Sequence, residues 1–349
     1  MKSRFKKISH LLLITMVSVL LLTACGQKEN VTSKTKESAT STEFKKTTLR
    51  FGSTSAEGSV VVETMKDFAD RVSKKTDGKV VIQIFPSSQL GGVKEMTQSL
   101  QLGALDMSMT QPASLVDMGV KEMSALVLPY IFRDFDHRWN VLAGEVGNSM
   151  LEKLNNSKLK LKGIGYFKDG ARSFFTNAKK PISKFEDVKG LKIRVQPYQM
   201  DSDMVSALGG NPTPTASSEL YSALQSGVVD GADQPIAGYY SGKYYEVAKS
   251  LTLDEHTYNT LVVLFSQISW DKLEPQAQKV IMDSWNEAEE KSKAKILSNE
   301  VEVLKKIESE GVKIIKLTDR DKWVAAMKPV YDKHGVGFED LISKIKAVK

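Results

Sequence analysis

Arg194 is the side chain in this sequence whose type and position best suit the binding of a small carboxylate. It follows Leu191, Lys192 and Ile193 in a short strand-like alternation, so we expect its side chain to leave the end of a strand, where α/β sheets place their ligands. A planar guanidinium presents two parallel N–H donors to one carboxylate, which a lysine ammonium does not. From the residues alone, a surface arginine paired with an Asp or Glu remains the commoner alternative.

The elements that position Arg194 alternate between strands and helices. The apolar run at 80–85 is typical of a strand buried on both faces by helices. In the first half, the patterns predict strands at 48–52, 80–85 and 107–109, and helices at 60–75 and up to residue 102. The order is β-α-β-α-β, which predicts an α/β sheet with right-handed crossovers.

In the second half, strand and helix patterns continue to alternate and are then followed by one long helical pattern. It predicts strands at 160–167, 192–195 and 261–268, and helices at 200–208 and 217–226. From 275 to 310 the spacing is helical, with no Gly or Pro after Pro275 and with many Lys and Glu. We therefore expect one long C-terminal helix whose charges form a solvated face.

The N-terminus has the pattern of an export signal. Basic residues precede an uncharged run at 11–22, which leads into Leu22-Thr23-Ala24-Cys25. The run is shorter than the roughly 20 residues that span a membrane, so residues 1–24 are predicted to be a signal peptide rather than a permanent anchor helix. We therefore expect an extracytoplasmic protein. Cys25 is the only cysteine, which excludes a disulfide within one molecule.

Residues 25–47 read as a flexible tether, because Lys, Glu, Ser and Thr dominate and large apolar side chains are almost absent. The whole chain has a formal net charge of +7, but most of it comes from the signal and the tether, and the body after them carries about +1. This removes the electrostatic basis for nucleic-acid binding.

Leu-Thr-Ala-Cys resembles the lipobox of bacterial lipoproteins, in which the cysteine is acylated and becomes the first mature residue. The resemblance implies that Cys25 carries a lipid anchor to the cell membrane. Stable anchoring requires two or more acyl chains. The alternative is an ordinary signal peptide with an incidental cysteine.

The body, from about residue 48 to 345, resembles the DctP-type solute-binding subunit of tripartite ATP-independent periplasmic (TRAP) transporters. The matching stretches are LRFG (49–52), FPSSQLGG (85–92), LVLPYIF (126–132), KGLKIRV (189–195), GNPTP (210–214), SELYSALQSGVVDGADQP (218–235) and KYYEVAK (243–249). The resemblance implies a two-domain, periplasmic-binding-protein-like α/β fold. Crossing strands would join the domains, with a long C-terminal helix behind both and a cleft that closes on ligand.

The resemblance also implies a function. Members capture small organic acids, among them C4-dicarboxylates, sialic acid and uronates, and deliver them to a small and a large membrane subunit. We expect domain I to comprise 48–170 with about 258–298, and domain II to comprise 171–257 with about 299–349. A monomer without cofactor or metal is expected.

In the family, the arginine that matches Arg194 clamps the ligand carboxylate, and Arg172 matches a second arginine. The alternative for Arg172 is an ion pair at the hinge. Asp233 and Gln234 stand where Glu-Asn is common, and an amide such as Gln234 both accepts and donates hydrogen bonds. His256 matches a histidine near the ligand in some members, and a structural role is equally open.

Four positions depart from the sialic-acid-binding members, namely Thr54, Gln111, Ser114 and Ser217. These departures argue against sialic acid. Neutral hydrogen-bonding groups such as Gln111 and Gln196 suit hydroxyls more than a second carboxylate, which favours a uronate or related sugar acid over a C4-dicarboxylate. Tyr239 and Tyr240 either line the groove or, at helical spacing, belong to the packing.

Three other functions are compatible with parts of the sequence. A substrate-binding lipoprotein of an ABC importer or an adhesin shares the signal, anchor and tether, whereas the KGLKIRV to DGADQP stretch favours a TRAP partner. A secreted enzyme is disfavoured, because the chain has no Gly-x-Ser-x-Gly, His-Glu-x-x-His or Walker A motif and only three histidines after the signal peptide. We therefore expect a binding protein and no enzyme.

Overall fold

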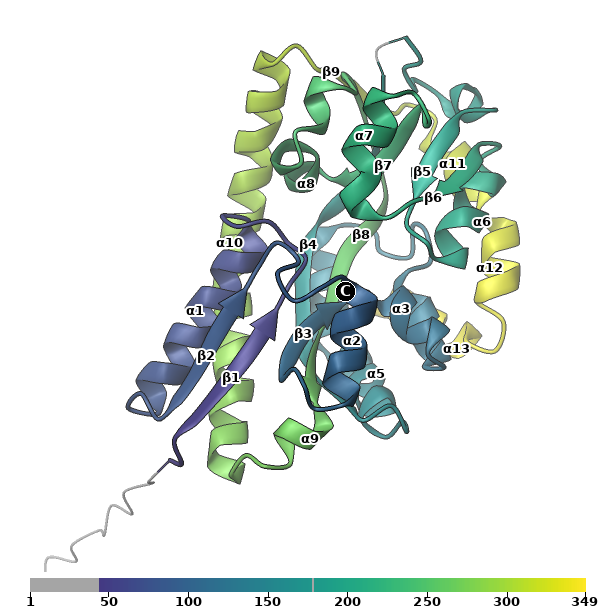
Figure 1. The fold of residues 1–349 in the computed structure, drawn as a ribbon. Helices are drawn as coiled ribbons and strands as arrows, with labels where there is room; N and C mark the ends of the chain where they lie inside the picture. The colour runs from purple at the N-terminus through teal and green to yellow at the C-terminus, as the bar shows by residue number, and fades with distance from the viewer. Residues whose placement is uncertain (1–43, 178) are drawn as a thin grey trace, which may run out of the picture. The chain divides into compact units, whose positions relative to one another are not determined.

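The computed structural model describes residues 44–177 and 179–349, and these residues belong to one compact unit (Figure 1). The predicted signal peptide at 1–24, the lipidation site Cys25 and nearly all of the predicted tether lie outside the described residues. Phe44 packs against the hydrophobic core, and the first strand begins at Thr47.

Within the described residues, nine strands form one sheet in the order β2-β1-β3-β8-β4-β7-β5-β6, with β9 added along β8. The strands are β1 (Thr47–Gly52), β2 (Val80–Phe85), β3 (Met107–Thr110), β4 (Leu161–Thr176), β5 (Lys192–Val195), β6 (Asn211–Pro214), β7 (Gly231–Pro235), β8 (Ser250–Ser266) and β9 (Lys313–Lys316). The predicted α/β class is confirmed.

The two long antiparallel strands β4 and β8 run through both halves of the sheet (Figure 1). Register shifts fall near their middle, between Lys168 and Ala171 and between Arg172 and Phe174. The predicted crossing strands are thus present, but the prediction that the strand ends near Phe167 was wrong. The apolar pattern breaks at Lys168-Asp169-Gly170, whereas the hydrogen-bonded ladder continues after a bulge.

The long helix α10 (Pro275–Ser309) confirms the predicted C-terminal helix. It packs against α1 (Val60–Lys75), and its buried Trp285 contacts the rings of Phe51 and Phe68 edge-on. The outer faces of the two helices carry ion pairs, such as the one between Arg71 and Glu287 at 2.8 Å. The charged residues of α10 therefore include a solvated face, as expected.

The other helices connect and cover the strands. They are α2 (Val93–Gln101), α3 (Pro112–Asp117), α4 (Phe135–Ala143), α5 (Glu145–Asn155), α6 (Gln199–Ala207), α7 (Leu220–Gln225), α8 (Ile236–Ser241), α9 (Gln267–Trp270), α11 (Arg320–Ala326), α12 (Lys328–His334) and α13 (Glu339–Ala347). Short 3-10 turns lie at Lys121–Leu126, Phe185–Val188, Ser217–Glu219 and Tyr244–Glu246. In the C-terminal segment, α12 packs on α6 and α13 packs on α5.

Two local predictions need correction. The helix expected at 217–226 is a 3-10 turn followed by α7, and residues 267–268 belong to α9 rather than to a strand. The hydroxyl of Ser266 accepts the backbone N–H of Ser269, and this N-cap ends β8 and starts the helix. No helix among the described residues combines the length and the apolar character needed to cross a membrane.

Candidate functional site

The strand ends of both halves meet beside the middle of β4 and β8. The last residue of β3, Thr110, pairs with Val262 of β8, and the last residue of β7, Pro235, pairs with Arg172 of β4. Strand β1 runs parallel to β3, and β5 runs parallel to β7, so β1 ends at the same edge as β3 and β5 ends at the same edge as β7. The carboxyl ends of two sets of parallel strands therefore converge on the crossing, where α/β sheets bind ligands.

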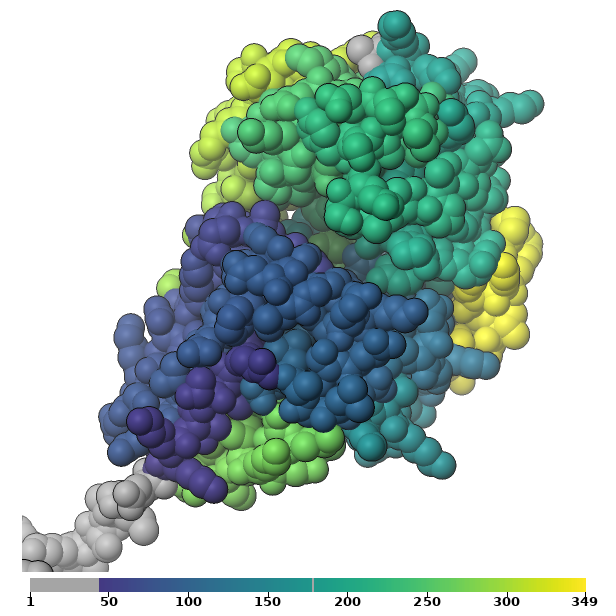
Figure 2. Space-filling model, viewed as in Figure 1, coloured from purple at the N-terminus to yellow at the C-terminus, as the bar shows by residue number. Residues whose placement is uncertain are grey.

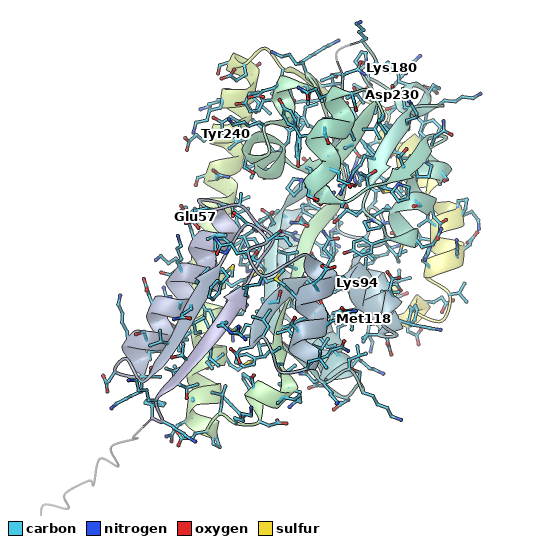
Figure 3. All side chains as sticks on the ribbon, viewed as in Figure 1. Glu57, Lys94, Met118, Lys180, Asp230 and Tyr240 are labelled. Atoms are coloured by element: carbon cyan, nitrogen blue, oxygen red, sulfur yellow. The ribbon has the colours of Figure 1, made fainter. Side chains whose placement is uncertain are left out.

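Figure 2 shows a hollow at this place, between the surfaces of α2 and α7. Lys94, near the start of α2, lies toward this hollow in Figure 3. Thr54, Gln111 and Gln196 follow the ends of β1, β3 and β5, whereas Arg172 and His256 lie within the long strands β4 and β8.

Arg194 lies on β5 and is completely buried. Its Nε donates to the main-chain oxygen of Thr215 at 2.9 Å, and its Nη2 donates to Oγ of Ser217 at 3.1 Å. Its Nη1 has no hydrogen-bond partner in the described part of the chain. Burial lowers the pKa of Arg194, against the charge of Asp233, which raises it. A buried donor without a partner is costly, so Nη1 marks a place for an acceptor from outside.

Arg172 lies in the middle of β4 and is paired within the protein. Its Nε donates to Oδ2 of Asp233 at 2.6 Å, and its Nη2 donates to the main-chain oxygen of Asp233 at 2.9 Å. Both side chains are buried. The two residues come together because β7 runs antiparallel to β4 at this point. The structure thus contains the ion pair that sequence reasoning offered as the alternative for Arg172.

His256 lies on β8, is completely buried and contacts two carboxylates. Its Nδ1 is 2.5 Å from Oδ2 of Asp254, and its Nε2 is 3.2 Å from Oδ2 of Asp233. The ring also stacks on Phe174, with centroids 4.5 Å apart. The side chain of Asp233 therefore links Arg172 to His256, and Asp254 secures the far side of the imidazole.

The charges of this cluster shift each other's pKa values. Burial lowers the pKa of His256, but the charges and hydrogen bonds of Asp254 and Asp233 outweigh burial and raise it to about 9. Burial raises the pKa of Asp233, but Arg172 and His256 outweigh it and hold this pKa well below the usual range. At neutral pH the imidazole is therefore protonated and Asp233 is ionised.

Gln111 follows β3 and belongs to a polar chain that leads into the interior. Its Nε2 donates to Oδ1 of Asn259 at 3.5 Å, and Nδ2 of Asn259 donates to Oδ2 of Asp169 at 3.1 Å. The buried Arg138 of α4 donates to the main-chain oxygens of Asn259 and Asp169. These hydrogen bonds link β4 to β8 where the two strands cross, and they orient the side-chain amide of Gln111.

The remaining predicted residues occupy loops and a strand end. Thr54 is exposed after β1, Gln196 is half-buried after β5, and Gln234 is half-buried in β7. Ser217 is exposed but its Oγ accepts from Arg194. The structure thus directly links Arg194 to Ser217, and Arg172 to Asp233 and His256.

The tyrosine pair belongs to the packing. Tyr239 is completely buried, and its hydroxyl donates to the main-chain oxygen of Ala248 at 2.5 Å. Tyr240 stacks on Tyr245 with centroids 5.4 Å apart, and Figure 3 places it on α8 beside α10. Tyr244 is the aromatic residue of this segment that influences the pKa of Arg194.

Sequence reasoning missed two acidic residues. Asp254 was available from the alternation in β8, because residues 254 and 256 share one face of a strand. Asp201 lies in the first turn of α6, and no sequence signal shows that the charges of Arg172 and Arg194 influence its pKa. No cluster of three or more His, Cys, Asp or Glu suited to a metal occurs among the described residues.

A charged, mostly buried site at the crossing of two α/β halves defines a class: the two-domain solute-binding protein of the periplasmic-binding type. Residues 51–336 match the family described as bacterial extracellular solute-binding protein, family 7 (DctP). The chain belongs to this family, which confirms the family predicted from the sequence motifs.

Solved structures of TRAP periplasmic solute-binding proteins agree with this assignment. The chain is 30% identical to one from Pseudomonas putida F1 with bound D-glucuronate, with a TM-score of 0.83 over 87% of this chain and 98% of that one. It is 32% identical to one from a Bradyrhizobium strain in complex with galacturonate, with a TM-score of 0.82 over 86% and 99%. A third, from Sulfurospirillum deleyianum with bound succinate, is 33% identical, with a TM-score of 0.79 over 88% and 100%.

Proposed function

We propose that this protein captures a uronate or a related sugar acid outside the cytoplasm and delivers it, chemically unchanged, to the membrane subunits of a TRAP transporter. The observation that carries the proposal is Nη1 of Arg194, a fully buried guanidinium nitrogen without a partner among the described residues. A ligand carboxylate supplies the acceptor that this nitrogen lacks.

The orientation of Arg194 supports a carboxylate in a defined pose. Thr215 and Ser217 hold Nε and Nη2 from one side, so the guanidinium plane is fixed before the ligand arrives. A pre-oriented donor loses little side-chain entropy on binding. Arg172 adds positive charge nearby, although Asp233 already occupies Nε and Nη2.

The neutral groups around the arginine support a sugar acid. The amides of Gln111, Gln196 and Gln234 both donate and accept, which fits hydroxyls in variable orientations. Related structures were solved with D-glucuronate and galacturonate bound, and one with succinate, so a C4-dicarboxylate is the second candidate.

The mechanism we propose is closure of two domains, 48–170 with about 258–298 and 171–257 with about 299–349, around the crossing of β4 and β8. Closure on an empty site would enclose an unpaired guanidinium, whereas a bound carboxylate neutralises it. Ligand therefore shifts the population toward the closed form. Thr54 and Gln111 would reach the ligand from one domain, and Arg194, Arg172, Gln234 and His256 from the other.

We also propose that the protein acts as a monomer, tethered to the cell membrane by a lipid on Cys25. Acylation would keep the captured acid near the small and large membrane subunits that accept it.

A thermal-shift screen of uronates, aldonates, dicarboxylates and 2-oxo acids tests the proposal, followed by calorimetric titration. A tight ligand raises the melting temperature by mass action, by an amount that grows with the logarithm of its concentration. We expect a uronate or aldonate to give the largest rise. Failure of every organic acid to shift the transition would contradict the proposed function.

A further inference from the structure

The two edges of the Arg194 guanidinium differ in what they contact. Nε and Nη2 share the side edge, where Nε donates to the main-chain oxygen of Thr215 at 2.9 Å and Nη2 donates to Oγ of Ser217 at 3.1 Å. The terminal edge consists of Nη1 and the second N–H of Nη2, and Nη1 has no hydrogen-bond partner among the described residues. A guanidinium can bind a carboxylate through either edge. In Arg194 only the terminal edge is left for a ligand.

Arg172 shows the opposite arrangement at its own side edge. There Nε donates to the carboxylate oxygen Oδ2 of Asp233 at 2.6 Å, and Nη2 donates to the main-chain oxygen of the same residue at 2.9 Å. The side edge of Arg194 instead meets a carbonyl and a hydroxyl, which are both neutral. Neutral acceptors satisfy the two nitrogens without compensating the positive charge, so this charge remains available to a carboxylate at the terminal edge.

The chain that carries Ser217 is fixed to the strand that carries Arg194. Strand β6 runs parallel to β5, and beyond it the N–H of Thr215 donates to the main-chain oxygen of Val195 at 3.1 Å. Ser217 then begins a 3-10 turn, and the completely buried Leu220 follows this turn. Backbone pairing on one side and a buried leucine on the other therefore hold the Ser217 hydroxyl beside the guanidinium.

We propose that Ser217 is a positioning residue for Arg194: its hydroxyl occupies the side edge, so that the ligand carboxylate binds at the terminal edge through Nη1. Without the hydroxyl, Nη2 would lose its acceptor and the guanidinium would be less firmly oriented before the ligand arrives. This inference rests on the proposed function and gives Ser217 a role that acts through the arginine.

The test is a double-mutant cycle on the intact protein. Calorimetric titration measures affinity for whichever of D-glucuronate, D-galacturonate, D-erythronate and succinate the wild type binds most tightly. Ser217→Ala should weaken binding by about threefold to tenfold, the range expected for one hydrogen bond. In an Arg194→Ala background, Ser217→Ala should change the affinity by less than about twofold, because the group that it positions is absent. Arg194→Lys is the second background, used if the Ala variant does not fold or binds too weakly.

Two further variants separate positioning from a general effect on the turn. Ser217→Thr keeps the hydroxyl and should retain the wild-type affinity within about twofold. Ser218→Ala is the matched control, because Ser218 is the next residue of the same turn and is also exposed, and it should leave the affinity unchanged. Ser217 is exposed as well, so its replacement removes no core side chain.

An unchanged affinity in Ser217→Ala, or an equal loss in Ser217→Thr, would overturn the positioning role while leaving organic-acid binding intact. An equal loss with and without Arg194 would also overturn it, since Ser217 would then act on the ligand independently of the arginine. A wild type that binds none of the four acids would overturn the proposed function together with this inference.

Discussion

Asp233 holds Arg172 by two contacts, through its side-chain Oδ2 at 2.6 Å and its main-chain oxygen at 2.9 Å. The same Oδ2 lies 3.2 Å from Nε2 of His256. Two of the nitrogens of Arg172 are thereby occupied before any ligand arrives. The two arginines of the site consequently have different states: Arg172 is already organised by a carboxylate, and Arg194 retains a buried nitrogen without an acceptor in the described structure.

Arg194→Ala should weaken binding of the preferred acid by about 2–5 kcal/mol, because a buried charge pair loses one member. Arg194→Lys keeps the charge but loses the planar fork, so its affinity should fall between those of the wild type and the Ala variant. Calorimetric titration measures both variants. Equal affinity in all three proteins would exclude Arg194 as the carboxylate clamp.

Asp233→Asn should lower the free energy of unfolding by about 3–5 kcal/mol, since Arg172 and His256 would be left as buried charges without their shared partner. Urea denaturation followed by fluorescence measures this change. Glu186→Gln is a suitable control, because its partner Lys322 and Glu186 itself are both more than half exposed, and exposed pairs contribute little. A loss as small in Asp233→Asn as in the control would contradict the structural role of the buried pair.

The pH dependence of stability should report on His256. Its pKa in the folded protein is raised to about 9, so its stabilising contribution is complete below the unfolded pKa of about 6.5. The contribution is lost as pH rises from about 6.5 to 9, by up to about 3 kcal/mol. His256→Gln should flatten this decline. A wild-type stability that stays constant over that interval would show that the imidazole is neutral in the folded protein.

The affinity for a monocarboxylate should decrease as pH rises through about 7, because Asp201 ionises there and then competes for the positive charge of Arg194. Between pH 6 and 8 we expect a decrease of up to about tenfold in the wild type. Titrations at several pH values should show little change for Asp201→Asn. A decrease of equal size in that variant would assign the effect to another group.

Gly165 should not tolerate a side chain. A Cβ atom at this position of β4 would lie 2.5 Å from Cδ1 of the buried Trp285, so Gly165→Ala forces the indole or the strand to move. We expect a loss of about 1–3 kcal/mol in the free energy of unfolding. Gly170→Ala is the matched control on the same strand, because its nearest atoms would be 3.8 Å away. Similar losses of unfolding free energy in both variants would mean that replacing a glycine of β4 is itself destabilising, and that the contact with the indole of Trp285 is not the cause.

Periodicity predicted the elements that are long and amphipathic or uniformly apolar. Helix α1, strand β2 and helix α10 lie within a residue of their predicted bounds. It did not predict β6, whose sequence is Asn-Pro-Thr-Pro, or β7, whose sequence is Gly-Ala-Asp-Gln-Pro. These residues have turn-like propensities, and their strands exist because β5 and β4 pair with them. Tertiary pairing of this kind leaves no local signal.

The motifs identified Arg194, Arg172, Asp233, His256 and Ser217 as residues of the site but did not show which of them pair. Arg194 and Arg172 follow from the resemblance to the family, and both lie buried near the strand crossing. Sequence spacing does not reveal that Asp233 reaches Arg172, because the two residues are 61 positions apart and meet only through the β4–β7 register. The contact of His256 with Asp233 likewise depends on β8, β4 and β7 lying next to one another in the sheet.

The shared strands β4 and β8 also determine how the molecule should come apart. Each contributes hydrogen bonds to both halves of the sheet, so neither half can melt without exposing ladder edges and apolar side chains of the other. Heating should therefore produce a single cooperative calorimetric transition instead of two separate ones. Partial proteolysis should likewise fail to release either half as a stable fragment.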